Sequence, residues 1–168
     1  MGSITDRMKG AALLDNATYE EVEADTTATG QAAVVVTLGA IASGIGMARG
    51  GSGGIVAAVL GSLIGWALWA GITYLIGDKV LGGTATWGEL LRTLGFAQAP
   101  RVLGILGIIP GMQWLVASVI GIWVLITGIV AIRQALDFST GKAVATAVLG
   151  WLAMMIPMAL LGLSFYRH

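Results

Sequence analysis

The chain of 168 residues contains no cysteine and a single histidine. The missing cysteine excludes disulfides, thiol nucleophiles, iron–sulfur ligands and Cys-type zinc sites. The one histidine, His168, is the last residue, so neither a Ser-His-Asp triad nor a cluster of histidine ligands can form. We therefore expect a non-enzymatic protein with no catalytic residues, no metal site and no cofactor.

Charged residues are also scarce, at 11% of the chain, while 57% of the residues are hydrophobic. A typical soluble domain has about 25% charged residues, and a small domain cannot bury this much apolar surface. Nine basic and nine acidic residues cancel, so there is no basic field to attract nucleic acid. The composition predicts a membrane protein surrounded by lipid, with no nucleic-acid partner.

Four long stretches contain no charged residue at all. They are residues 26–48, 50–77, 102–132 and 143–166. A helix needs about 20 mostly apolar residues to cross a hydrocarbon core of about 30 Å. The third stretch is too long for one helix, and Ile109-Pro110-Gly111 is a natural break within it.

These stretches predict an all-α, polytopic transmembrane helix bundle with five spans. The predicted helices are near 29–48, 54–77, 87–109, 113–135 and 142–164. The third would be a single helix kinked at Pro100, and a re-entrant or interfacial segment is the alternative.

The basic residues predict the orientation of the bundle. With the N-terminus inside, the inner side carries Arg7, Lys9, Lys79, Arg92, Arg133 and Lys142, whereas Arg49 and Arg167 lie outside. We therefore expect residues 1–28 to form a cytoplasmic segment and 29–168 to form the membrane domain. Residues 1–25 do not resemble a signal peptide, so we expect them on the mature chain. A four-span arrangement would return the C-terminus to the inside.

A short acidic, amphipathic helix is predicted at 18–24, with Thr18 and Glu21 forming a capping box. The carboxylates concerned are Glu20, Glu21, Glu23 and Asp25. They are compatible with a docking surface, with a divalent-cation site, or with an ordinary solvated helix whose charges favour its dipole.

Small residues recur at four-residue spacing, which places both members of a pair on one helix face. The pairs are Gly39 with Ser43, Gly46 with Gly50, Gly61 with Gly65, and Gly95 with Ala99. In lipid such faces let helix backbones approach closely. They predict close packing within the bundle or association into a homo-oligomer.

Arg101 falls inside the predicted third helix, and an ionisable residue at membrane depth is a functional candidate. A structural arginine, paired with a carbonyl or carboxylate or extended towards the headgroups, is the alternative. Glu89 and Arg92 are three residues apart and could pair on one helix face. Lys142 is explained by a role in orienting the last helix.

The order of several motifs resembles the YIP family of multispanning membrane proteins. The motifs are residues 19–25, 86–100, 103–111, 132–136 and 139–143. Gly95, Phe96, Pro100 and Lys142 stand at motif positions, and Pro110 is the next-to-last residue of the motif at 103–111. The resemblance implies five spans with a cytoplasmic N-terminus and, because bacterial members are most similar, a bacterial cytoplasmic (inner) membrane.

In eukaryotes the YIP family is linked to vesicle traffic and Rab-type GTPases. This chain lacks the Asp-Leu-Tyr-Gly-Pro element of such members, so a GTPase partner is doubtful. The expected function is a membrane scaffold or accessory protein that acts through helix packing and partner binding in the bilayer. Its acidic N-terminal helix would be available to a cytoplasmic partner. The alternatives are a dedicated subunit of a respiratory, photosynthetic or secretory complex, and a small transporter or channel that uses Arg101 and the broken third helix.

Overall fold

The computed structural model describes residues 2–47 and 52–165, all of which lie in helices, turns or short connections. The elements are α1 (Ile4–Ala12), α2 (Asn16–Ala24), α3 (Ala28–Gly46), α4 (Ser52–Tyr74), the π-helix η1 (Leu75–Val80), α5 (Trp87–Phe96), the 3-10 helix η2 (Ala99–Ile108), α6 (Gln113–Ala135) and α7 (Thr140–Phe165).

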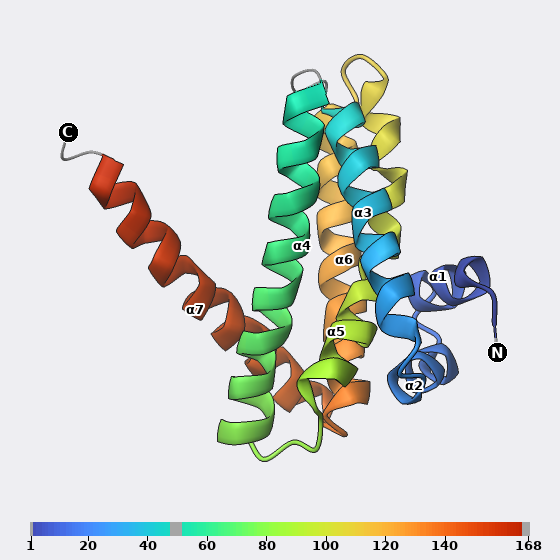
Figure 1. Cartoon of the computed structure of the whole chain (residues 1–168), viewed down its shortest axis with the longest axis vertical. Coiled ribbons are helices and arrows are strands. Elements are labelled where there is room, and N and C mark those ends of the chain that lie inside the picture. Colours follow the sequence, from blue (N-terminus) through green and yellow to red (C-terminus); the bar gives the residue numbers. More distant parts are fainter. Residues whose placement is uncertain (1, 48–51, 166–168) are drawn as a thin grey trace.

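The long helices α3, α4 and α6 lie side by side along the long axis of the molecule (Figure 1). The consecutive elements α5 and η2 follow the same axis, with α5 at the lower end and η2 at the upper end. The α1–α2 hairpin packs on the side of the bundle, on α5 and α6. Helix α7 contacts α4 and α6 near its start and then diverges from the bundle.

Three helical segments are long and apolar enough to cross a membrane: Ala28–Gly46, Gly54–Val80 and Gln113–Ala135. Within the part of α7 whose side chains are described, Thr140–Met155 is a shorter apolar helix. The outer faces of these helices are apolar as well, with Ile64 on α4 and Ile122 on α6 each 61% exposed. The prediction of an all-helical fold with several helices long and apolar enough to span a membrane is confirmed, while five spans and an inside N-terminus stay predictions.

The predicted single helix at 87–109 is wrong. An α-helix ends at Phe96, and a 3-10 helix runs from Ala99 to Ile108. Pro100, at the start of η2, has no amide hydrogen to continue the α-helical bonding. A 3-10 helix rises about 2.0 Å per residue against 1.5 Å for an α-helix, so the two elements together extend about 35 Å. They run from the lower end of the bundle to the upper end (Figure 1).

Small residues bring α3 and η2 into backbone contact. A Cβ atom on Gly46 would overlap the carbonyl oxygen of Gly104, and one on Gly39 would lie 2.9 Å from Cβ of Arg101. On α5, a Cβ on Gly95 would lie 2.6 Å from Cβ of Ala32. These positions pack within the bundle, as predicted, whereas Gly61 has open space beside it and Gly50 lies outside the described residues.

The N-terminal segment differs from the prediction in two ways. Helix α2 begins at Asn16 and is capped by Asp15, whose carboxylate accepts bonds from the amide and hydroxyl of Thr18. The expected capping box of Thr18 and Glu21 is therefore wrong, because Glu21 is held by Arg7 instead. Helix α1 was not expected from the sequence, and it begins with a capping box formed by Ser3 and Asp6.

Candidate functional site

A buried arginine holds the α1–α2 hairpin together. Arg7, 2% exposed, donates to the carboxylates of Glu21 at 2.8 Å and Asp25 at 2.7 Å and to the amide oxygen of Gln31 at 3.0 Å. Bonds from Thr27 and from Arg7 lower the pKa of Asp25 to about 2. Two of the four acidic side chains expected on one solvated helix are thus internal ion-pair partners.

The hairpin is fixed to the membrane helices by hydrogen bonds to backbone carbonyls. Arg92 of α5, itself buried, donates to the carbonyl oxygens of Val22 and Glu23 at the end of α2. The hydroxyl of Tyr19 donates to the carbonyl of Thr127 at 3.3 Å, and the indole of Trp123 donates to that of Ala12 at 2.8 Å. The hairpin is therefore tied to α5 and α6.

The expected pairing of Glu89 with Arg92 is wrong. Arg92 turns towards α2, because the last carbonyls of a helix are natural acceptors for a cation. Glu89 instead accepts the amide hydrogen of Thr86 at 2.7 Å, in the capping box that begins α5.

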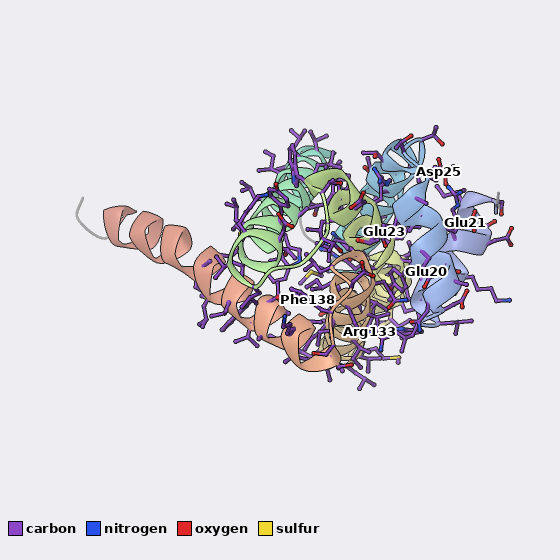
Figure 2. The ribbon with its side chains drawn as sticks, turned by 90° about the horizontal axis from the view of Figure 1, so that it is seen from below. Glu20, Glu21, Glu23, Asp25, Arg133 and Phe138 are labelled. Atoms are coloured by element: carbon purple, nitrogen blue, oxygen red, sulfur yellow. The ribbon has the colours of Figure 1, made fainter. Side chains whose placement is uncertain are left out.

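Glu20 and Glu23, the other two carboxylates of the acidic helix, lie with two carboxylates from elsewhere in the chain in a shallow depression, called here the acidic depression. It is lined by Glu20, Glu23, Ala24, Glu89, Gln134 and Asp137 and has a volume of about 280 Å³. Figure 2 shows Glu20 and Glu23 on α2, beside the lower end of α6. Burial, together with the charges of Glu89 and Asp137, raises the pKa of Glu23 to about 7. The depression thus concentrates negative charge that the protein itself does not neutralise fully.

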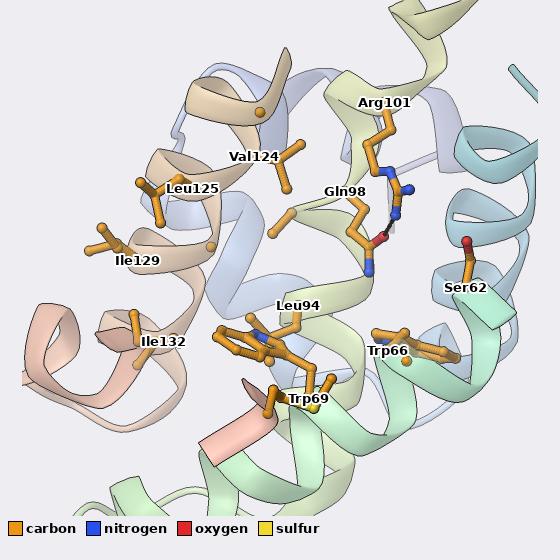
Figure 3. Close-up of a pocket in the computed structure, with 16 residues that line it drawn as sticks. Ser62, Trp66, Trp69, Leu94, Gln98, Arg101, Val124, Leu125, Ile129 and Ile132 are labelled. Carbon is orange, nitrogen blue, oxygen red and sulfur yellow. Dashed lines mark hydrogen bonds between the residues drawn. The ribbon is translucent and has the colours of Figure 1, made fainter. Parts of the chain in front are cut away.

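Arg101 lies at the junction of three cavities inside the bundle. Their volumes are about 420, 280 and 440 Å³, and Arg101 lines each of them. Its guanidinium donates to the amide oxygen of Gln98 at 2.8 Å (Figure 3). The expected pairing with a carboxylate or backbone carbonyl is absent among the described residues.

The other predicted residues have structural surroundings. Phe96 and Pro100 are buried in the core, and Gly95 lies against Ala32. Pro110 is exposed in the turn between η2 and α6, where Gly111 has a φ of 80°. Lys142 donates to the carbonyl of Leu81 at 3.4 Å and lies over the ring of Phe138.

Sequence reasoning missed Arg7, which holds the α1–α2 hairpin together, and Gln98 and Ser62, which line the cavity of about 420 Å³ beside Arg101. The sequence identifies Arg7 only as a topogenic charge, because its burial depends on tertiary packing. Gln98 is a polar residue in an otherwise apolar run, three residues before Arg101. This spacing could have identified it as a partner of Arg101. Within the described part of the chain, no group of three His, Cys, Asp or Glu residues is arranged to hold a metal ion.

Comparison with known proteins identifies the family. The sequence model of the Yip1 domain matches residues 15–161, a range that begins at the cap of α2 and so includes the acidic helix. No curated protein and no solved structure matched the chain. The match covers most of the sequence, and the apolar helices agree with it. The chain is therefore an integral membrane protein that belongs to the Yip1 family.

Proposed function

We propose that this protein is a non-enzymatic membrane scaffold or accessory protein, and that α2 presents the acidic depression to a basic segment of another membrane protein. The family generally acts in membrane trafficking without catalysis, which agrees with a binding role. The observation that carries the proposal is the fixed position of α2 on the bundle. Arg92 and Tyr19 attach this helix to α5 and α6.

Rigid attachment matters because it removes the entropic cost of ordering a docking surface when the partner binds. The carboxylates of the depression also repel each other, and a perturbed acid of this kind is typical of functional sites. A lysine or arginine side chain from a partner would relieve that repulsion. We therefore expect the partner to contribute a basic segment on the same side of the membrane as α2.

An affinity purification from native membranes tests this proposal. Glu20 is exposed and its substitution leaves the attachment of α2 intact, so Glu20→Lys should reduce partner recovery about tenfold by placing a cation in the depression. Asp78→Lys is the matched control, because Asp78 is an acidic residue of η1 outside the depression.

The outcomes separate the possible roles. A species recovered at a fixed stoichiometry, and lost with Glu20→Lys alone, would identify a dedicated subunit interface. A species recovered in lower amounts with the same sensitivity would indicate an accessory role. Equal recovery with both variants would contradict the proposal.

A further inference from the structure

Among the residues that the structure describes, Arg101 has no anionic partner. All nine Asp and Glu side chains of the chain lie in the described residues, and none of them forms an ion pair with Arg101. The guanidinium has five N–H donors, and the described contacts include one bond, to Gln98. A cation that is both desolvated and without a counter-ion is unfavourable, so this group is suited to receive an anion.

Arg101 lies beside the middle of a candidate membrane span. Its backbone lies against α3, where Ser43 Oγ donates to the Arg101 carbonyl at 3.5 Å and Gly39 leaves room for the Arg101 side chain. From Gly39, α3 continues for about 10 Å towards its upper end and about 17 Å towards its lower end. The candidate membrane span Ala28–Gly46 therefore extends above and below the level of Arg101.

The three cavities differ in where they lead from Arg101. Two of them reach the upper end of α3, where both are lined by Met47. The third, of about 420 Å³, continues downward between α4 and α6 as far as Ile132 and Ala147. Arg101 thus lies between space at the upper end of the bundle and space that extends between α4 and α6.

The lining of the lower cavity is divided by polarity (Figure 3). Arg101, Gln98 and Ser62 lie on one side, and each can donate hydrogen bonds to an anion. Across from them lie Leu125, Ile129 and Ile132, with the rings of Trp66 and Trp69 at the lower end. A charged group next to a hydrocarbon-sized apolar space is the arrangement expected for an amphiphile.

We propose that this site binds an anionic phospholipid of the surrounding bilayer. The headgroup phosphate accepts hydrogen bonds from Arg101, with Gln98 and Ser62 as further donors. One acyl chain lies in the cavity between α4 and α6, against the apolar side chains. Arginine favours phosphate because its planar guanidinium offers parallel donors to two oxygens, and the acyl chain enters from lipid, where such molecules are abundant.

Lipid retention measured by native mass spectrometry tests the site. The protein is released from nanodiscs of phosphatidylcholine that contain a minor fraction of phosphatidylglycerol with the same acyl chains. We expect retention of phosphatidylglycerol over phosphatidylcholine, and a loss of about tenfold in that preference for Arg101→Gln. Arg101→Lys should keep part of the preference, because it keeps the charge.

Two further variants make the result specific. Gly128 lines the lower cavity and has open space around its Cβ position, so Gly128→Leu should fill the space for the acyl chain and reduce retention while leaving the charge in place. Arg133→Gln is the control, because Arg133 is a basic residue at the lower end of α6, bonded to Asn16. It should retain phosphatidylglycerol like the original protein.

Three results would overturn the proposal. The first is equal retention of the two lipids by the original protein. The second is an equal loss of preference in Arg133→Gln, which would indicate general attraction of anionic lipid. The third is displacement of phosphatidylglycerol by inorganic phosphate with no effect of Gly128→Leu, which would indicate a site for a soluble anion. If Arg101→Gln does not fold, Gly128→Leu decides between these results.

Discussion

Leu14 has an unusual backbone conformation at the end of α1. Its φ is 64°, in the left-handed region that favours glycine, and it stands where a helix usually ends with glycine. The amide of Asp15 donates to the carbonyl of Gly10 at 3.0 Å, which is the bond of a Schellman motif. A leucine in this conformation costs about 1–2 kcal/mol.

We therefore expect Leu14→Gly to increase the free energy of unfolding by about 1 kcal/mol. Leu13→Gly is the matched control, because Leu13 is an exposed leucine with a negative φ of −87°. It should lower stability, since glycine is more flexible in the unfolded chain. The free energy of unfolding of both variants is measured in mixed micelles. Equal effects of the two substitutions would contradict the strain at Leu14.

The raised pKa of Glu23 predicts that the stability of the folded protein depends on pH. Its pKa is raised from 4.5 in the unfolded chain to about 7 by burial and by neighbouring carboxylates. Between these values the folded protein binds more protons than the unfolded one, so stability falls as pH rises from 4.5 to 7 and then stays level. Glu23→Gln should remove this slope and stabilise the protein at pH 8 by about 1 kcal/mol, allowing for solvent screening.

Thermal unfolding at about pH 5, 6, 7 and 8, which covers the titration of Glu23, measures how stability changes with pH. The original protein and Glu23→Gln are compared. Glu20→Gln is the control, because Glu20 is also in the acidic depression but is exposed. It should keep most of the slope. A slope of the opposite sign, or one that Glu23→Gln leaves unchanged, would contradict the assigned pKa.

Among the elements, the pairing of α3 with η2 depends on glycine. Gly46 and Gly104 are in backbone contact, and such contact gains dispersion energy that larger residues would prevent. The 3-10 conformation of η2 lets one short segment follow α3 towards the upper end of the bundle. This combination replaces the single helix kinked at Pro100 that the sequence pattern favours.

Two alanine substitutions compare a packed glycine with an open one. Gly46→Ala should lower the free energy of unfolding by more than about 2 kcal/mol, because its Cβ meets a backbone atom that cannot move aside easily. Gly61→Ala should be neutral or stabilise by up to about 1 kcal/mol, because its Cβ position is open and alanine favours helix. Similar effects of the two would show that α3 and η2 do not pack as described.

At the scale of the whole molecule, the charge-free stretches predicted the positions of the long helices well. The helix expected at 113–135 is Gln113–Ala135, and the break at Ile109-Pro110-Gly111 is present. The docking of α1 and α2 could not be predicted, because it depends on Arg7, Tyr19 and Arg92 reaching groups far along the chain. The division of the chain at residue 28 stays a prediction, although α2 packs directly on α5.

The absence of cysteine makes the orientation of the bundle directly measurable. With five spans and an inside N-terminus, Met112→Cys in the upper turn should react with a membrane-impermeant maleimide in intact cells. Ser139→Cys, in the exposed connection between α6 and α7, should react only after the cells are permeabilised. The reverse pattern would contradict the orientation inferred from the basic residues.

The central claim is that α2 offers the acidic depression to a partner protein, and site-specific photo-crosslinking in intact cells tests it most directly. A crosslinking residue at position 20 lies at the depression, whereas one at position 9 lies on the exposed side of α1. We predict one defined protein adduct from position 20, lost when Glu89→Lys reverses a charge of the depression, and no such adduct from position 9. No protein adduct from position 20, or the same adducts from both positions, would contradict the claim.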